Sequence, residues 1–165
     1  MLLSGKTLDI PARPAPLSPR DLAVWGALVV AAVNGLAGLF GALRWYLRAP
    51  SRGFWFGVRG GQAVVLAYAI LVGALILAKD RPSSGLFYVY ALVPVAVGFV
   101  AEQLRIVAAD QVLTAHDIDD ARQVGSLPAE QQQAIVLAIL RRELGVMALA
   151  ALVVCVLALR AAGTY

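Results

Sequence analysis

The sequence contains one cysteine and one histidine, and each scarcity excludes a class of function. Cys155 alone can form neither an internal disulfide nor a CxxC redox pair, which excludes a quinone-linked thiol oxidase. His116 alone argues against a haem held by two histidines between helices. The acidic stretch 116–120 does not match a calcium-binding loop, because Pro128 stands at the twelfth position from Asp117, where such a loop needs glutamate. We therefore expect neither a cofactor nor a metal.

Charged residues are also scarce, at 15% of the 165 residues, whereas hydrophobic residues make up 61%. A soluble domain carries about 25% charged and roughly 45–50% apolar residues. Both departures are typical of a protein whose surface meets lipid. The net charge of +4 does not indicate nucleic-acid binding, because the basic residues stand at the ends of apolar runs. We expect membrane lipids as partners and no nucleic acid.

Lysine is nearly absent, since only Lys6 and Lys79 accompany the arginines, and alanine, leucine and valine dominate the composition. Such usage is typical of a GC-rich bacterial genome. The membrane would then be a bacterial plasma (inner) membrane.

Four long apolar runs predict an all-α fold, a polytopic four-transmembrane-helix bundle over residues 21–163. A helix needs about 20 mostly apolar residues to cross roughly 30 Å of hydrocarbon. None of the runs alternates as a barrel strand would. Residues 1–20 read as a Pro-rich N-terminal tail. We expect the spans at about 22–43, 58–78, 84–104 and 143–162.

The segment 106–142 is the one sizeable connection between spans. Ser126 and Pro128 form a helix start signal, and Glu130 suits the positive end of the helix that follows. Apolar residues then recur at helical spacing, and nothing breaks the pattern before the fourth span. We expect one long helix, whose first part forms a helical extension on the cytoplasmic side.

The distribution of basic residues predicts the orientation. Four spans place both termini and the second loop on one side, with six basic residues, and the first and third connections on the other, with eight. Most of those eight stand close to span ends, where positive residues stay in the cytoplasm. We expect a multi-pass protein with both termini outside.

This topology brings polar residues of different spans to one membrane depth. Glu102 is the acid deepest in an apolar run, and it can pair with Arg105 three residues later. An ionisable residue within a span suggests a function, because burying it costs several kcal/mol unless it is paired. The alternative is a structural ion pair that fixes the register of the helices. The candidate binding cluster is Glu102, Arg105, Arg59, Gln62, Arg44 and Asn34.

Two residues inside the spans could shape this cluster. Asn34 lies among glycines at three- and four-residue spacing, which let helix backbones approach closely. We expect it to donate an interhelical hydrogen bond, with the lining of a polar pore as the alternative. Pro94 removes the hydrogen bond to the Tyr90 carbonyl, so it should kink its helix, either for packing or to open a cavity.

An Arg-Pro pair at 81–82, the stretch 85–90, and then Glu102 and Arg105 form a longer pattern. It resembles uncharacterised four-helix integral membrane proteins of high-GC, actinobacteria-like bacteria. In that pattern a histidine can precede the first tyrosine, whereas Phe87 stands there in this chain. The resemblance implies a four-helix membrane fold and no particular activity, and a ligand role of the histidine would not carry over.

No nucleophile–base–acid set is recognisable, so the sequence leans against an enzyme. The sequence shows no internal repeat, which argues against an inverted-repeat transporter. The favoured hypothesis is a non-catalytic assembly or accessory subunit of a membrane complex, a homo-oligomer or bound to a partner. The alternatives are a small oligomeric channel or transporter with Glu102 and Asn34 lining a polar cavity, and a lipid- or quinone-binding membrane enzyme.

These hypotheses predict different arrangements. A pathway requires Glu102 and Asn34 to face a water-accessible cavity. An assembly role predicts a cluster closed by its own ion pairs and an exposed face of small residues, with the glycine-rich first span as one candidate. A lipid enzyme predicts a lateral opening between spans, lined by Glu102 with Arg59 or Arg105.

Overall fold

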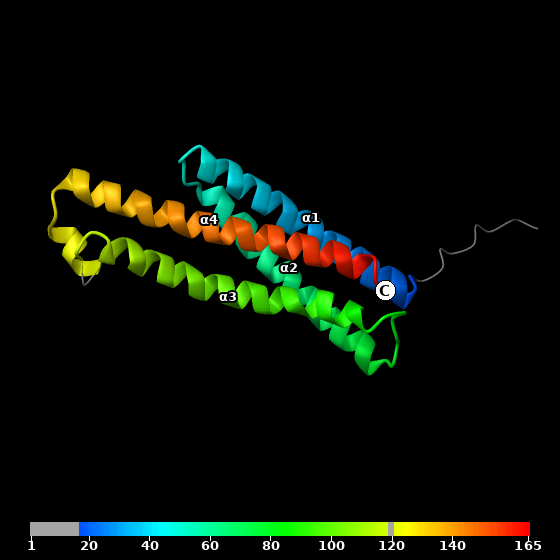
Figure 1. The fold of residues 1–165 in the computed structure, drawn as a ribbon. Helices are drawn as coiled ribbons and strands as arrows, with labels where there is room; N and C mark the ends of the chain where they lie inside the picture. Colours follow the sequence, from blue (N-terminus) through cyan, green and yellow to red (C-terminus); the bar gives the residue numbers. More distant parts are fainter. Residues whose placement is uncertain (1–16, 119–120) are drawn as a thin grey trace, which may run out of the picture.

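The computed structural model describes residues 17–118 and 121–165, which form four long helices and, within those ranges, no strand (Figure 1). All four helices are long and apolar enough to cross a membrane, so the predicted all-α four-helix membrane fold is confirmed. The predicted tail up to residue 16 and the acids at 119–120 lie outside the described residues. The helices are α1 (Pro19–Tyr46), α2 (Arg52–Leu77), α3 (Leu86–Thr114) and α4 (Ala129–Ala162), with a short 3-10 helix η1 (Ala121–Ser126) before α4.

The two ends of the bundle are built differently (Figure 1). At the hairpin end lie the α1–α2 loop and the connection from α3 through η1 to α4. At the termini end the α2–α3 loop lies against the C-terminal residues. There the Ser83 hydroxyl donates to the Tyr165 main-chain oxygen at 2.8 Å, and the Tyr165 hydroxyl donates to Asp80 at 2.6 Å. Which end faces the cytoplasm stays a prediction.

α4 runs without interruption from Ala129 to Ala162, which confirms the prediction of one long helix. Its 34 residues span about 51 Å at 1.5 Å per residue, well beyond the roughly 30 Å of a hydrocarbon core. The extra length forms a projecting hairpin with α3 (Figure 1). Val112, Ile118 and Ile135 pack together inside it, so the hairpin carries a small apolar cluster of its own.

The glycines of α1 are used inside the fold. A Cβ atom added at Gly38 would lie 2.8 Å from the Leu152 side chain and 3.0 Å from its backbone nitrogen, and one at Gly41 would overlap the Phe54 ring. α1 therefore packs closely against α4, and Phe54 of α2 packs against α1 at Gly41. The glycine face that the sequence offered for assembly is occupied within the chain, which corrects that expectation.

The larger apolar cluster lies toward the termini end, and a second one lies toward the hairpin end, formed by Phe54, Val58, Ala101, Leu144, Met147 and Ala148. At the termini end, Tyr68 and Val72 of α2 and Phe87 of α3 are at most 4% exposed, and they pack with alanines of α1 and α4. The Tyr68 hydroxyl donates to the Ala23 carbonyl at 3.1 Å. Toward the hairpin end α2 and α3 leave space between them, and the candidate site lies in that space.

Candidate functional site: a cavity closed by an ion-pair chain

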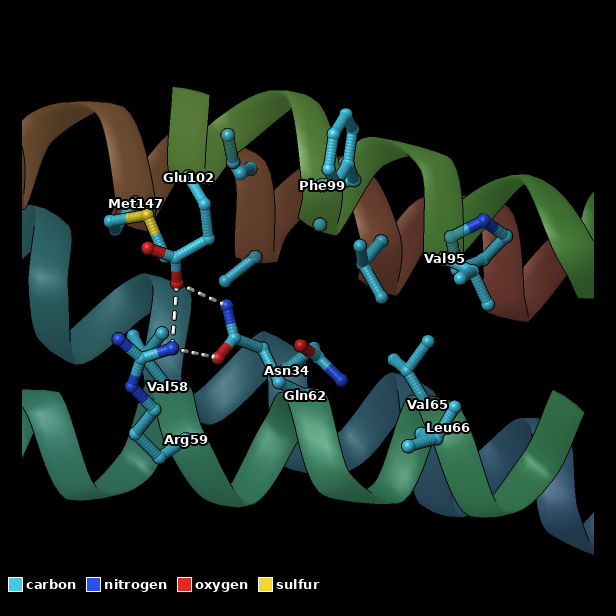
Figure 2. Close-up of a pocket in the computed structure, with 16 residues that line it drawn as sticks. Asn34, Val58, Arg59, Gln62, Val65, Leu66, Val95, Phe99, Glu102 and Met147 are labelled. Atoms are coloured by element: carbon cyan, nitrogen blue, oxygen red, sulfur yellow. Dashed lines mark hydrogen bonds and ion pairs between the residues drawn. The ribbon is translucent and has the colours of Figure 1, made fainter. Parts of the chain in front are cut away.

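A cavity of about 250 Å³ lies between α2 and α3. Figure 2 shows α2 and α3 forming its two walls, with Val65 facing Val95, and Leu66 and Phe99 also line it. Met147 of α4 contributes to the floor. Leu66 is 57% exposed and Phe99 is 67% exposed, so the rim of the cavity faces outward from the bundle, toward the hydrocarbon of a bilayer.

Small residues of α3 explain why the space is empty. Gly98 lines the cavity, and a Cβ atom added there would meet no atom within 4 Å. Pro94 also lines it, although α3 continues as one helix past this residue. Pro94 is buried in the cavity wall, and its two predicted roles, packing or opening a cavity, stay predictions.

Polar side chains close the hairpin end of the cavity (Figure 2). Glu102 Oε1 accepts hydrogen bonds from Arg59 Nη1 at 2.7 Å and from Gln62 Nε2 at 2.8 Å. Arg59 Nη1 also donates to Gln62 Oε1 at 2.7 Å. The three side chains form a closed triangle that bridges α2 and α3, and the Gln62 amide is oriented by its two bonds.

The charges continue from this triangle across α3 to α4. Arg105 Nη1 lies 3.6 Å from Glu102 Oε2, and Arg105 Nε lies 4.0 Å from Glu143. The Arg105 guanidinium also stacks over the Trp55 ring at 5.2 Å. We call the series Arg59, Glu102, Arg105 and Glu143 the ion-pair chain. Its signs alternate, and three helices contribute to it.

The ion-pair chain lies below exposed apolar side chains on both walls. Phe56, which is 79% exposed, precedes Arg59 by three residues, and Val107, which is 48% exposed, follows Glu102 by five. At 1.5 Å per residue, a bilayer that covers these side chains places the charges about 5–8 Å inside its apolar boundary. Unpaired charges at that depth cost several kcal/mol, so the pairing has a physical cause.

Asn34 lies on the floor of the same cavity and is 5% exposed. Its amide nitrogen donates to the Val30 carbonyl of its own helix at 2.9 Å, so the predicted interhelical hydrogen bond is wrong. The side chain meets α2 at Gly61 instead, where an added Cβ atom would lie 2.7 Å from the Asn34 oxygen. Asn34 thus requires a glycine opposite it, and Gly61 allows α1 and α2 to meet at this depth.

Arg44 does not belong to this group. It does not line the cavity, and its Nε is buried without a hydrogen-bond partner among the described residues. Arg141 of α4 shows the same feature and stacks over Trp45 at 5.3 Å. Of the six predicted residues, the structure therefore joins Glu102, Arg105, Arg59 and Gln62 by direct contacts and places Asn34 in the same cavity.

Sequence reasoning did not connect Trp55, Met147 or Gly98 with the site. A signal for Trp55 was present, since Trp55, Arg59 and Gln62 follow one another at the four- and three-residue spacing of one helix face. Met147 and Gly98 carry no chemical signature, and their place depends on which helices meet.

Comparison of the chain with known protein families, with curated proteins and with solved structures finds no match. The function is therefore inferred from the site alone, and the resemblance to actinobacteria-like membrane proteins stays a prediction.

Proposed function

We propose that this protein is a non-catalytic accessory subunit of a membrane complex, and that it holds an amphiphilic molecule of the bilayer between α2 and α3. One observation carries the proposal: the cavity faces outward, is mostly apolar, and has its charged side chains only at the end where Arg59, Gln62 and Glu102 meet, with the Asn34 amide on the floor. This distribution matches a molecule with a polar head and an apolar chain.

The size of the cavity limits what it can take up. Pockets for whole small-molecule ligands measure about 300–1,000 Å³. At about 250 Å³ this cavity falls just below that range. It therefore suits a single hydrocarbon chain with part of its head, while the rest of the ligand stays in the bilayer.

A channel through a single chain is less well supported. A continuous path would have to pass the termini end, where Tyr68, Val72 and Phe87 are closely packed. Catalysis is also less well supported, because Glu102 Oε1 already accepts two hydrogen bonds and Glu102 Oε2 faces Arg105. The carboxylate is engaged as a bridge between helices rather than free to act as a base.

The accessory role is supported by the outer face of α2. Small residues recur there at spacings of three, four and seven residues, and all of them are exposed: Gly60, Ala63, Ala67 and Ala74. Small residues let a second membrane helix approach closely. A partner chain or a second copy can therefore pack on α2 without blocking the glycine seam between α1 and α4.

Filling the cavity tests the proposal. Gly98→Leu adds a side chain to the cavity wall, whereas Gly73→Leu adds the same side chain to α2 outside the cavity; at both positions an added Cβ atom would meet no atom within 4 Å. The probe is hexadecanoate, added to each purified protein in detergent, and native mass spectrometry counts the molecules bound per chain. We expect one on the wild type and on Gly73→Leu, and none on Gly98→Leu. Equal binding by all three would refute the proposal.

A further inference from the structure

Resting on the proposed function, we infer that the ligand carries an anionic head, a carboxylate or a phosphate, which docks on the unengaged side of the Arg59 guanidinium. The head group and the apolar chain of such a ligand would contact different parts of the site.

At the polar end of the cavity, the hydrogen-bond acceptors are engaged and the open groups are donors. Glu102 Oε1 and Gln62 Oε1 already accept hydrogen bonds. Arg59 makes its contacts through Nη1 alone, and Nε and Nη2 have no recorded partner within the described residues. Since a guanidinium carries five N–H donors, the groups left open to a ligand are donors. A head that accepts hydrogen bonds is therefore required.

The ion-pair chain has a positive end and a negative end, and only the positive end is open to a ligand. Its positive end, Arg59, lines the cavity and is 57% exposed, whereas its negative end, Glu143, is 18% exposed and does not line the cavity. Glu102 also lines the cavity, but Arg59 and Arg105 both pair with its carboxylate. An anion on Arg59 would continue the alternation of signs, whereas a cation would meet the positive end of the chain.

The depth of Arg59 in the bilayer also suits the head of an amphiphile. Arg59 lies just inside the exposed Phe56, close to where an amphiphile of the bilayer holds its head. In Figure 2 the unengaged nitrogens of Arg59 point away from Val65 and Val95, so the head lies at the outer edge of the polar end and the apolar chain passes from there into the space between Val65 and Val95. Charge-assisted hydrogen bonds from a guanidinium to a carboxylate or phosphate are about twice as strong as neutral ones, and weakly hydrated surroundings strengthen them.

Head-group selectivity tests this inference. Four probes share one hexadecyl chain and differ in the head: hexadecanoate, hexadecyl phosphate, hexadecanol and hexadecyltrimethylammonium. Inorganic phosphate without a chain is the fifth probe. Binding is measured on the full chain in phosphatidylcholine nanodiscs, for the wild type, for Arg59→Gln and Arg59→Lys, and for Arg52→Gln. Arg52 is exposed in the first turn of α2 and lies outside the cavity, so it is the matched control.

We expect hexadecanoate and hexadecyl phosphate to bind the wild type about tenfold more tightly than hexadecanol, the gain of a charge-assisted bond over a neutral one. Arg59→Gln should remove this preference while hexadecanol still binds, which also shows that the variant is folded. Arg59→Lys should keep part of the preference, and Arg52→Gln all of it. Inorganic phosphate should bind at least tenfold more weakly than hexadecyl phosphate.

The outcomes separate the two proposals. Equal affinity for all four chain-bearing probes, each lost in Gly98→Leu, would overturn the anionic head and leave the amphiphile cavity standing. Tighter binding of the ammonium probe, or a preference for anions that survives Arg59→Gln, would also overturn it. If inorganic phosphate binds as tightly as hexadecyl phosphate, the site is an anion site without a chain subsite. Binding of no probe to the wild type would overturn the proposed function as well.

Discussion

At the termini end, α2 and α3 meet in one apolar cluster, whereas toward the hairpin end a cavity lies between them beside a second cluster around Phe54 and Val58, and an ion-pair chain joins the two helices. Tyr68, Val72 and Phe87 fill the first region. In the second, Gly98 leaves space, and Arg59 and Glu102 bridge it. The difference shows two ways of holding membrane helices together: apolar side chains packed along the helices, and one polar bridge with a cavity beside it.

The polar bridge is a costly way to join helices unless the space beside it is used. Side chains larger than Gly98 would fill the cavity and would allow α2 and α3 to pack as they do at the termini end. The chain instead combines a missing side chain with charges that lie beneath exposed Phe56 and Val107. This combination is our reason for assigning the binding role to the hairpin half.

The largest effect is expected from adding the same side chain to a packed and to an open position. Gly38→Val forces atoms against the backbone nitrogen of Leu152, so we expect it to lower the free energy of unfolding by about 3 kcal/mol. At Gly98 an added Cβ atom would meet no atom within 4 Å, so we expect Gly98→Val to be neutral. Unfolding in mixed micelles of denaturing and mild detergent measures both. Similar losses for the two variants would contradict the contrast between seam and cavity.

The next effect concerns the polar bridge. Glu102→Gln keeps the shape of the side chain but leaves Arg59 and Arg105 without their shared carboxylate, and we expect a loss of about 2 kcal/mol. A double-mutant cycle with Arg59→Gln should give a coupling energy of about 1 kcal/mol. Glu130→Gln, on the exposed start of α4, is the control. Additive effects within error would mean that the bridge does not join α2 to α3.

A smaller effect is expected at the termini end. Tyr68→Phe removes the hydrogen bond to the Ala23 carbonyl but keeps the packed ring, so the loss should be about 1 kcal/mol. The same micelle unfolding measures it. A loss larger than that of Glu102→Gln would indicate that the termini end, too, depends on polar contacts, against the distinction between the two ends.

The smallest effect concerns the contact between the C-terminal residues and the α2–α3 loop. Tyr165→Phe removes the bond to Asp80 and keeps the edge-to-face contact with Phe87, so we expect about 0.5 kcal/mol. Burial and the hydrogen bond to Asp80 raise the pKa of Tyr165 to about 12. The neutral form is favoured in the fold, so this contribution is present below pH 10 and is lost as the pH rises toward 12.

The absorbance titration of tyrosinate, compared between the wild type and Tyr165→Phe, checks this pKa. The difference between the two curves should show a step near pH 12. A step at the ordinary value of about 10 would mean that the contact with Asp80 does not form in solution.

Apolar run length and helix signals predicted the four spans and the unbroken α4, because both depend on properties local to the sequence. The depth argument also brought Arg59, Gln62 and Glu102 together, since a fixed rise per residue converts position in a span into depth. The sequence did not predict how each helix is rotated about its own axis. Whether Gly38 faces α4 or a partner, and whether Gly98 faces lipid or a neighbouring helix, depends on which helices meet.

The prediction of an interhelical hydrogen bond from Asn34 was wrong for a related reason. An amide in a span requires a partner, but the sequence does not show whether the nearest acceptor belongs to a neighbouring helix or to the turn before it. The structure supplies the carbonyl of Val30 in the same helix, while Gly61 of α2 only provides space.

Photo-crosslinking tests the central claim, that a chain from the bilayer enters between α2 and α3, most directly. The probe is hexadecanoate with a diazirine along its chain, in phosphatidylcholine nanodiscs, and mass spectrometry maps the labelled residues. Met147, on the cavity floor, is 3% exposed, and Leu144, outside the cavity, is 1% exposed. The account predicts labelling of Met147 but not of Leu144, and loss of the Met147 label in Gly98→Leu. Labels confined to outward-facing side chains such as Leu36 and Ile70 would contradict it.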